Sequence, residues 1–265
     1  MNRAHEIDYR IYGEEMQYVE VELDPNETAI AEPGAFMMMD DGVQMQTIFG
    51  DGSNQGNGGL LGKLFSAGKR LLVGENLFMT AFTNTAYGKK RVSFASPYPG
   101  KIIPVPLSNY GYRVICQKDA FLCAAKGVSV GIEFQRKLGT GLFGGEGFIM
   151  EKLEGDGMAF LHAGGHIVEK QLQPGELIKI DTGCIVGFTS TVDYDIQFVG
   201  GIKNTLFGGE GVFFATLRGP GTVWIQSLPI SRLAGRILQY ATVSRREEGS
   251  ILGGLGNLLD GDGKW

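Results

Sequence analysis

A short motif that recurs three times is the feature of this chain that most constrains its fold. A Gly-Glu pair set among apolar residues occurs at Glu75, Glu146 and Glu210. Each copy is followed by an apolar segment, a turn and a second apolar segment. Short apolar runs bounded by glycine and proline are typical of antiparallel β-hairpins. The sequence therefore predicts an all-β fold built from three similar units.

A second recurring element supports the same organisation. Leu23–Glu27 reads Leu-Asp-Pro-Asn-Glu and Leu172–Glu176 reads Leu-Gln-Pro-Gly-Glu, and a short apolar strand follows each. We place the middle copy at Gln117–Cys123, where Pro and Glu are lost. The predicted organisation is a single β body over residues 1–230, with repeats at 9–107, 108–171 and 172–230.

One such unit has too few strands to enclose a core of its own. We therefore expect three tandem antiparallel β-sandwich repeats that share a core around a pseudo-threefold axis. Strand edges left open on such a body favour closure by association with further copies. A homo-oligomer, most simply a homotrimer, is the predicted assembly.

Two segments outside the regular repeat predict short amphipathic helices. The Gly-rich insertion in the first repeat, 50–72, ends in apolar residues at helical spacing over 60–72. The segment 231–265 is predicted to begin with a helix and end in a Gly-rich flexible tail. The apolar face of that helix is formed by Ile230, Leu233, Ala234, Ile237 and Leu238.

Composition and charge narrow the classes of function. The 265 residues carry a net charge of −5, so there is no overall basic field to attract nucleic acid. DNA binding is not expected. Three cysteines in a chain of this length do not indicate a disulfide framework. The N-terminus has no signal-peptide pattern and no run is long enough to cross a membrane, so we expect a cytoplasmic protein.

The order of the motifs resembles a known family. The Gly-Glu copies, the turn at Asp24–Glu27 with Glu32–Ala35, and the turn at Leu161–Gly165 are together similar to a widespread bacterial family of unknown function. That family is related to the yeast mitochondrial biogenesis protein of the "altered inheritance of mitochondria" series, and the resemblance covers about residues 8 to 240. It implies a fold like that of the tryptophan RNA-binding attenuation protein, with three β-sandwich repeats per chain and trimeric assembly. It implies no established catalytic residue.

The repeated glutamates are the first candidate site. A threefold arrangement, within the chain or in a trimer, would bring Glu75, Glu146 and Glu210 together. Converging carboxylates bind a cation or raise one another's pKa. The alternative is structural, with each carboxylate accepting backbone N–H groups in its own turn. The flanking glycines are predicted to hold backbone conformations that other residues resist, and they are Gly74, Gly145, Gly147, Gly209 and Gly211.

Two histidines form the second candidate site. His162 and His166 are separated by Ala-Gly-Gly, which excludes the helical spacing of zinc proteases. A metal bound there would need a carboxylate or cysteine to complete its ligands. The alternative is a pair of histidines in a turn.

No convergent set of catalytic side chains stands out in the sequence. The leading hypothesis is therefore a non-enzymatic homo-oligomeric β scaffold or binding protein without a cofactor. A metal-dependent enzyme using His162 and His166 is one alternative. A peripheral membrane or complex-organising protein is another, because 60–72 carries cations beside apolar residues. RNA binding through tyrosines is suggested by fold analogy alone, and the acidic balance argues against it.

Overall fold

A computed structural model describes residues 3–49, 78–136, 148–199, 212–238 and 240. Within these ranges the chain forms 19 β-strands, three short 3-10 turns and one helix. All the strand pairs in its sheets are antiparallel, so the all-β class predicted from the sequence is confirmed. The insertion helix expected at 60–72 lies outside the described residues.

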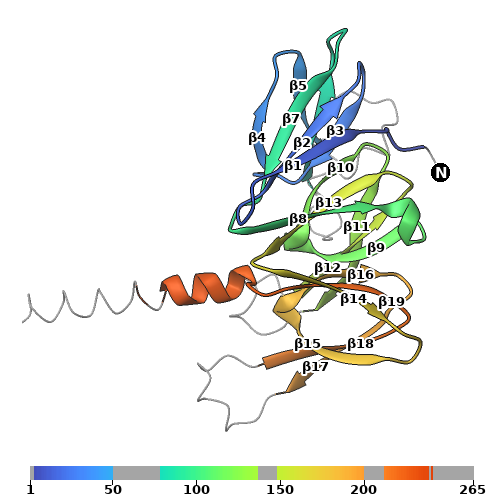
Figure 1. Cartoon of the computed structure of the whole chain (residues 1–265), viewed down its shortest axis with the longest axis vertical. Helices are drawn as coiled ribbons and strands as arrows, with labels where there is room; N and C mark the ends of the chain where they lie inside the picture. Colours follow the sequence, from blue (N-terminus) through green and yellow to red (C-terminus); the bar gives the residue numbers. More distant parts are fainter. Residues whose placement is uncertain (1–2, 50–77, 137–147, 200–211, 239, 241–265) are drawn as a thin grey trace, which may run out of the picture.

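The strands fall into three consecutive groups along the chain (Figure 1). The first group is β1 (Asp8–Tyr12), β2 (Tyr18–Leu23), β3 (Thr28–Ala31), β4 (Phe36–Met39), β5 (Val43–Phe49), β6 (Phe78–Asn84) and β7 (Lys90–Ala95). The second is β8 (Gly100–Pro106), η2 (Leu107–Tyr110), β9 (Arg113–Gln117), η3 (Lys118–Ala120), β10 (Phe121–Ala125), β11 (Ser129–Arg136), β12 (Phe148–Glu154) and β13 (Met158–Gly164). The third is β14 (Ile167–Leu172), β15 (Leu177–Asp181), η4 (Thr182–Cys184), β16 (Ile185–Thr189), β17 (Asp193–Val199), β18 (Val212–Arg218) and β19 (Gly221–Gln226).

One pairing pattern occurs in all three groups. Each group has six core strands, and the first group has β1 in addition. The last strand of each group lies between the first and third core strands, as in β2-β7-β4, β8-β13-β10 and β14-β19-β16. The fifth core strand lies between the second and fourth, as in β3-β6-β5, β9-β12-β11 and β15-β18-β17. Each group therefore contributes two three-stranded halves. The limits predicted from the sequence differ from this grouping in placing β8 and β14 with the preceding repeat.

Neighbouring groups are joined by strand pairing. β10 pairs with β3, and β16 pairs with β9, so each junction fuses two halves into a six-stranded sheet. The two junctions use the same register: Cys123 lies opposite Ala31 and Gly187 opposite Cys116, at equivalent positions. The half-sheets at the two ends, β1-β2-β7-β4 and β15-β18-β17, have no such continuation among the described strands.

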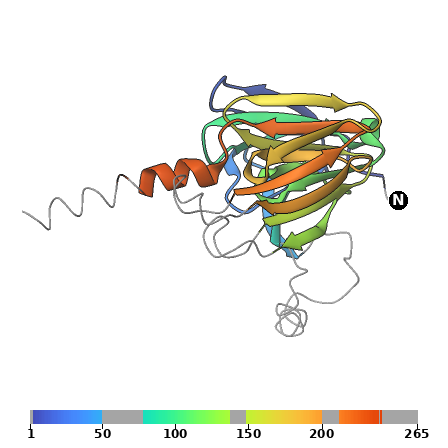
Figure 2. The same cartoon turned by 90° about the horizontal axis from the view of Figure 1, so that it is seen from below.

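The three groups are stacked along the long axis of the molecule (Figure 1). Seen along that axis, their strands overlay one another (Figure 2). The second group touches both neighbours through strand pairing, whereas no described strand of the first group pairs with one of the third. A pseudo-threefold relation between the repeats stays a prediction.

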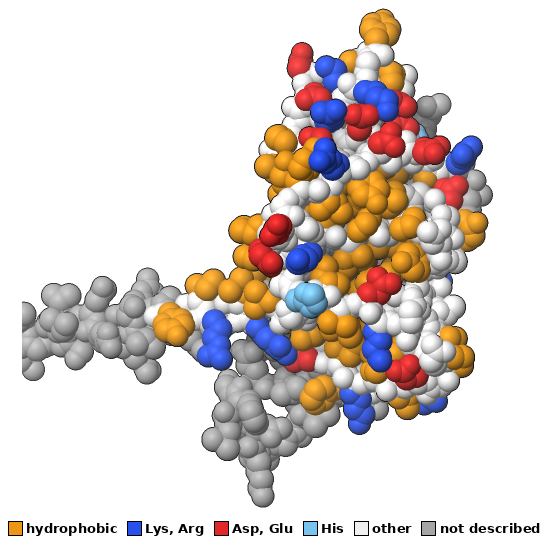
Figure 3. Space-filling view, viewed as in Figure 1, with side chains coloured by type: hydrophobic (Ala, Val, Ile, Leu, Met, Phe, Trp, Pro, Cys, Tyr) orange, Lys and Arg blue, Asp and Glu red, His pale blue; other side chains and the backbone are white. Residues whose placement is uncertain are grey.

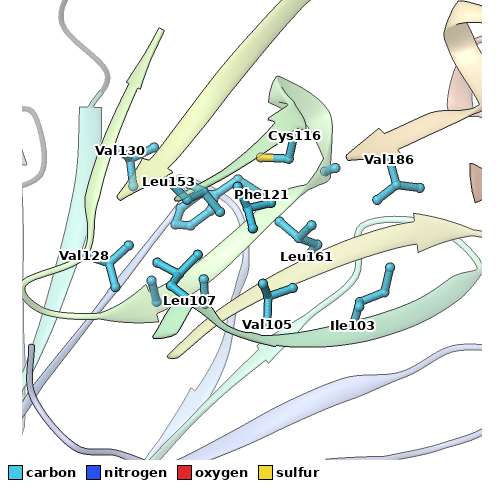
Figure 4. Close-up of a cluster of buried hydrophobic side chains, with 14 of the residues drawn as sticks. Ile103, Val105, Leu107, Cys116, Phe121, Val128, Val130, Leu153, Leu161 and Val186 are labelled. Atoms are coloured by element: carbon cyan, nitrogen blue, oxygen red, sulfur yellow. The ribbon is translucent and has the colours of Figure 1, made fainter. Parts of the chain in front are cut away.

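Hydrophobic side chains form three buried clusters that cross the junctions. The cluster around the second group includes Ile30 from β3 and Trp224 from β19, beside residues of its own such as Leu153 and Leu161. Figure 4 shows part of this cluster, with the side chains of several strands directed toward one another. Every residue of β10 and of β16 is buried, because these strands have a neighbour on both sides and a core against them. The junctions are thus part of the hydrophobic core.

The Pro-containing turns explain why the first and third groups start alike. Asn26 and Gly175 both have positive φ, and the backbone N–H groups of Asp24 and Gln173 donate to the carboxylates of Glu27 and Glu176, at 2.8 and 2.9 Å. The backbone N–H groups of Glu27 and Glu176 donate in return to the carbonyl groups of Asp24 and Gln173. These paired hydrogen bonds close each turn before the following strand.

The middle copy of this turn was placed wrongly from the sequence. Gln117–Cys123 spans the end of β9, the η3 turn and the start of β10. The connection between β8 and β9 is instead η2, which is followed by Gly111 and Tyr112, both with positive φ. A turn without the Pro-x-Glu pattern fills this place, so the pattern could not locate it.

The predicted C-terminal helix is present over residues 230–238, and it projects sideways from the β body (Figures 1 and 2). It begins directly after Pro229, near the η4 turn. Arg232 on its first turn forms an ion pair with Asp181 at 2.8 Å.

Close packing at the second junction makes a testable prediction. A Cβ atom on Gly187 would lie 2.8 Å from the Ile115 carbonyl oxygen and 3.2 Å from the Cys116 Cβ. Gly187→Ala should therefore force the two backbones apart and cost about 1 to 3 kcal/mol of the free energy of unfolding. Thermal unfolding followed by circular dichroism measures the effect, and Gly88→Ala is the matched control because nothing lies within 4 Å of its Cβ position. Equal melting temperatures for the two variants would contradict the tight junction.

Candidate functional site: the first repeat junction and an exposed edge strand

The repeated glutamates occupy the same connection in each repeat. Glu75, Glu146 and Glu210 fall between β5 and β6, between β11 and β12, and between β17 and β18. They and the flanking Gly74, Gly145, Gly147, Gly209 and Gly211 lie outside the described residues, so their convergence stays a prediction.

The two candidate histidines lie in different environments. His162, on β13, is 1% exposed, and its ring packs edge-on against Tyr98 with 4.2 Å between ring centroids. His166 lies beyond the turn after β13 and is exposed, and its backbone N–H donates to the Ser227 hydroxyl. Among the described residues no group of three His, Cys, Asp or Glu side chains has the geometry to hold a metal. A metal site on this pair stays a hypothesis.

His162 holds a turn in place. Burial lowers the pKa of its imidazole to about 4, and the backbone of Asp119, in the η3 turn, and of Tyr98 opposes this shift. Its Nε2 atom has no hydrogen-bond partner within the described part of the chain. Gln226 occupies the equivalent position on β19 and donates from Nε2 to the carbonyl of Gly183, in the equivalent η4 turn. Both side chains therefore anchor a 3-10 turn between two strands.

A buried and a partly buried carboxyl group interact electrostatically at the first junction, beside the same turn. Glu151, on β12, lies opposite Cys116 of β9 and is 2% exposed. Glu32 is partly buried in the turn after β3, and its backbone N–H donates to the carbonyl of Leu122 on β10, at 3.1 Å. Lys118 and Asp119 of η3 act on the charge of both carboxyl groups. The cluster thus joins residues of the first and second repeats.

The electrostatics of this cluster favour protonated carboxyl groups. Burial raises the pKa of Glu151 to about 8, and the negative charge of Glu32 adds to the effect. Burial also raises the pKa of Glu32 to about 7, with a further contribution from Asp119, while Lys118 opposes the rise. Two interacting carboxyl groups titrate as a pair, and the raised pKa values of both favour protonated forms near neutral pH. The arrangement can store and release a proton at a repeat junction.

The sequence analysis did not identify this cluster. Glu151 stands in the apolar segment that follows the second Gly-Glu motif, while Thr80 and Ala215 occupy its place in the equivalent hairpins. The available signal was a carboxylate placed directly after the apolar run Phe148–Met150. Its partner Glu32 comes from another repeat, and only the junction pairing brings the two together.

The second notable feature is the edge strand β4. Its four residues are all apolar and all exposed, with Phe36 at 41%, Met37 at 48%, Met38 at 44% and Met39 at 39%. The equivalent strands β10 and β16 are buried throughout. In the space-filling view, hydrophobic side chains gather on the flank where Figure 1 places β4 (Figure 3). Exposed apolar edge strands are normally covered or protected in soluble proteins.

Several tyrosines considered for RNA stacking pack against other rings of the β body. Tyr12 and Tyr18 stack on each other with their centroids 5.0 Å apart. Tyr110 packs edge-on against Trp224, and Tyr9 against Phe160. These faces are engaged within the fold.

The helix at the C-terminal end leaves apolar side chains exposed, and Ile237 is 60% exposed. In the part of the chain that the structure describes, no helix is long and apolar enough to cross a membrane.

Comparisons with known proteins agree with the resemblance seen in the sequence. A family model described as "Mitochondrial biogenesis AIM24" matches residues 9–228. An uncharacterised protein of Streptococcus pyogenes serotype M6 is 31% identical over 229 residues, which are 85% of this chain and 87% of that protein. The crystal structure of a Streptococcus pyogenes protein matches with a TM-score of 0.69 at 23% identity, covering 88% of this chain and 99% of that chain. The structural match concerns the fold alone.

The carboxyl cluster predicts a pH-dependent stability. Because the pKa of Glu151 in the folded chain, about 8, is above its usual value, folding favours the protonated form. The resulting stability is fully present below about pH 4.5 and is lost as the pH rises through about 8. Glu151→Gln keeps the neutral shape, so it should remove much of this decline and raise the melting temperature at pH 9. Melting scans from pH 5 to 9 measure the effect, with the exposed Glu14→Gln as control; parallel curves for wild type and Glu151→Gln would contradict it.

Proposed function

The chain belongs to the mitochondrial biogenesis AIM24 family, and we propose that it acts as a non-enzymatic, homo-oligomeric β scaffold in the cytoplasm. Its assembly is most simply a homotrimer. Its role is to hold copies of one repeated β-sandwich in a fixed array, and the ligand or partner that this array serves is a separate question.

The exposed apolar strand β4 carries this proposal. A monomer would leave four neighbouring apolar side chains of an edge strand in water. Edge strands of soluble monomers are normally protected by charge, proline or short length; β4 is short, with four residues, but it contains neither a charged residue nor a proline. Association with another copy would pair the strand and bury its side chains.

The energy available is adequate for a specific contact. Fully burying one large apolar side chain is worth about 1.5 to 3 kcal/mol. Four side chains that are each about two-fifths exposed offer several kcal/mol before the cost of association. Backbone hydrogen bonds along the edge add direction and register to this apolar contact.

The features of the buried cluster fit a structural role better than a catalytic one. His162 is neutral at pH 7 and anchors a turn, and Glu151 is almost wholly buried beside a strand of its own sheet. A catalytic acid or base must reach its substrate. We therefore assign the junction cluster to the coupling between repeats.

Light scattering after size-exclusion chromatography tests the proposal. Wild-type protein should elute as one closed oligomer over a range of concentrations. Met37→Gln combined with Met38→Gln should weaken association at least tenfold, because it replaces exposed apolar side chains of β4 by polar ones of similar length. The control is Tyr87→Gln, a fully exposed position in the turn between β6 and β7. A wild-type protein that stays monomeric at every concentration would refute the scaffold.

A further inference from the structure

The two ends of the chain carry complementary half-sheets. The first group ends in the order β2-β7-β4 and the third in the order β15-β18-β17. Inside the chain, each pair of such halves is fused into one six-stranded sheet, with orders β8-β13-β10-β3-β6-β5 and β14-β19-β16-β9-β12-β11. Joining β4 to β15 would produce a third sheet of the same order. Figure 1 places these two strands at opposite ends of the molecule, so one chain cannot make this contact with itself.

The equivalence extends to single residues. β4, β10 and β16 each have a register shift near their start, where they pair with β7, β13 and β19. The first paired residue after that shift is Met38, Cys123 and Gly187, respectively, so these three residues are equivalent. Ile180, Ala31 and Cys116 are equivalent in the same way. They lie opposite Ala215 of β18, Thr80 of β6 and Glu151 of β12, which occupy one position in the repeat. Both internal junctions pair these two places directly, as Cys123 with Ala31 and Gly187 with Cys116.

The register of the internal junctions can therefore be applied to the two edge strands β4 and β15. It sets Met38 opposite Ile180, Met39 opposite Lys179, and Asp40 opposite Ile178. We propose that β4 of one copy pairs antiparallel with β15 of the next copy in this register, so that the chain assembles head to tail. The proposal rests on the scaffold function and names its interface and its partner, a second copy of this chain.

The surfaces of the two edges support this pairing. Leu177, at the start of β15, is 50% exposed, Lys179 is exposed in the middle of the strand, and the partly exposed Asp181 ends it. β4 is uncharged, so no like charge opposes Lys179, and the aliphatic stem of the lysine can lie along Met39. Met38, which is 44% exposed, is larger than its internal counterparts Cys123 and Gly187, so its burial between molecules would contribute binding energy.

The geometry also predicts the kind of assembly. A contact between two different edges is heterologous, so each copy uses β4 toward one neighbour and β15 toward the other. Such contacts form a ring if the rotation closes and a filament if it does not. Every composite sheet in a closed ring would have the same order, within chains and between them.

A charge-reversal pair tests the register. Met39→Lys would place a second ammonium opposite Lys179, and like charges directly opposite on a sheet repel. The variant should dissociate at least tenfold more readily than wild type in sedimentation or light-scattering measurements. Adding Lys179→Glu to Met39→Lys should restore association, because the opposed charges then attract. Val168→Lys is the control, since β14 is an edge strand with no pairing partner in this scheme.

A cross-link tests the contact without relying on charge. Cysteines at Met38→Cys and Ile180→Cys, in a Cys184→Ser background, should form reducible bonds between copies because directly opposed residues lie within disulfide distance. The mismatched pair Met38→Cys with Val168→Cys should not.

The outcomes separate the two proposals. A monomeric wild type would overturn both. An oligomer that shows neither rescue by Lys179→Glu nor the cross-link would leave the scaffold standing and refute the β4–β15 interface, as would recovery of β4 bound to a strand of another protein. Melting curves of each variant confirm that the fold is kept.

Discussion

The backbone hydrogen bonds that cross from one repeat to the next are the interaction on which the rest of this structure depends. Each repeat supplies two three-stranded half-sheets. An edge strand of each half-sheet stays unpaired until a half-sheet of the neighbouring repeat pairs with it. Three of the strands at the two internal junctions, β3, β10 and β16, are consequently buried at every residue. At the end of the chain β4 has no such neighbour and is exposed, and the proposed association with further copies would pair it.

The first junction differs from the second in its polar content. Glu32 and Glu151 bring two carboxyl groups with raised pKa values into the first junction, whereas the corresponding places in the second are Gln117 and Ala215. The stability of the link between the first two repeats is thereby tied to proton uptake. The proposed junction between copies would combine apolar side chains with Lys179 of β15 and with Asp40, which follows β4. One geometry therefore serves three contacts of different chemistry.

Much of this architecture could be predicted from residues that control turns. The Leu23–Glu27 and Leu172–Glu176 turns were found because a proline, a residue with positive φ and a glutamate that closes the turn leave a local signature. The middle repeat reaches the same place through η2, which has no such signature, and its copy was misplaced. The partnership of Glu32 with Glu151 depends on pairing between residues far apart in the sequence, which no local pattern reports. The Gly-Glu motifs fall in one repeated connection, but those residues lie outside the described ranges.

Hydrogen–deuterium exchange on the assembled protein tests the central claim most directly. If copies continue the sheet from one to the next, amides of β4 and β15 should be as strongly protected as those of the internal junction strands β10 and β9, and the protection should fall on dilution to monomer. The contrary result is an intact oligomer whose β4 and β15 amides exchange within seconds, as unpaired edges do. That result would show that the copies contact each other through other surfaces and that the strand pairing of the internal junctions does not occur between copies.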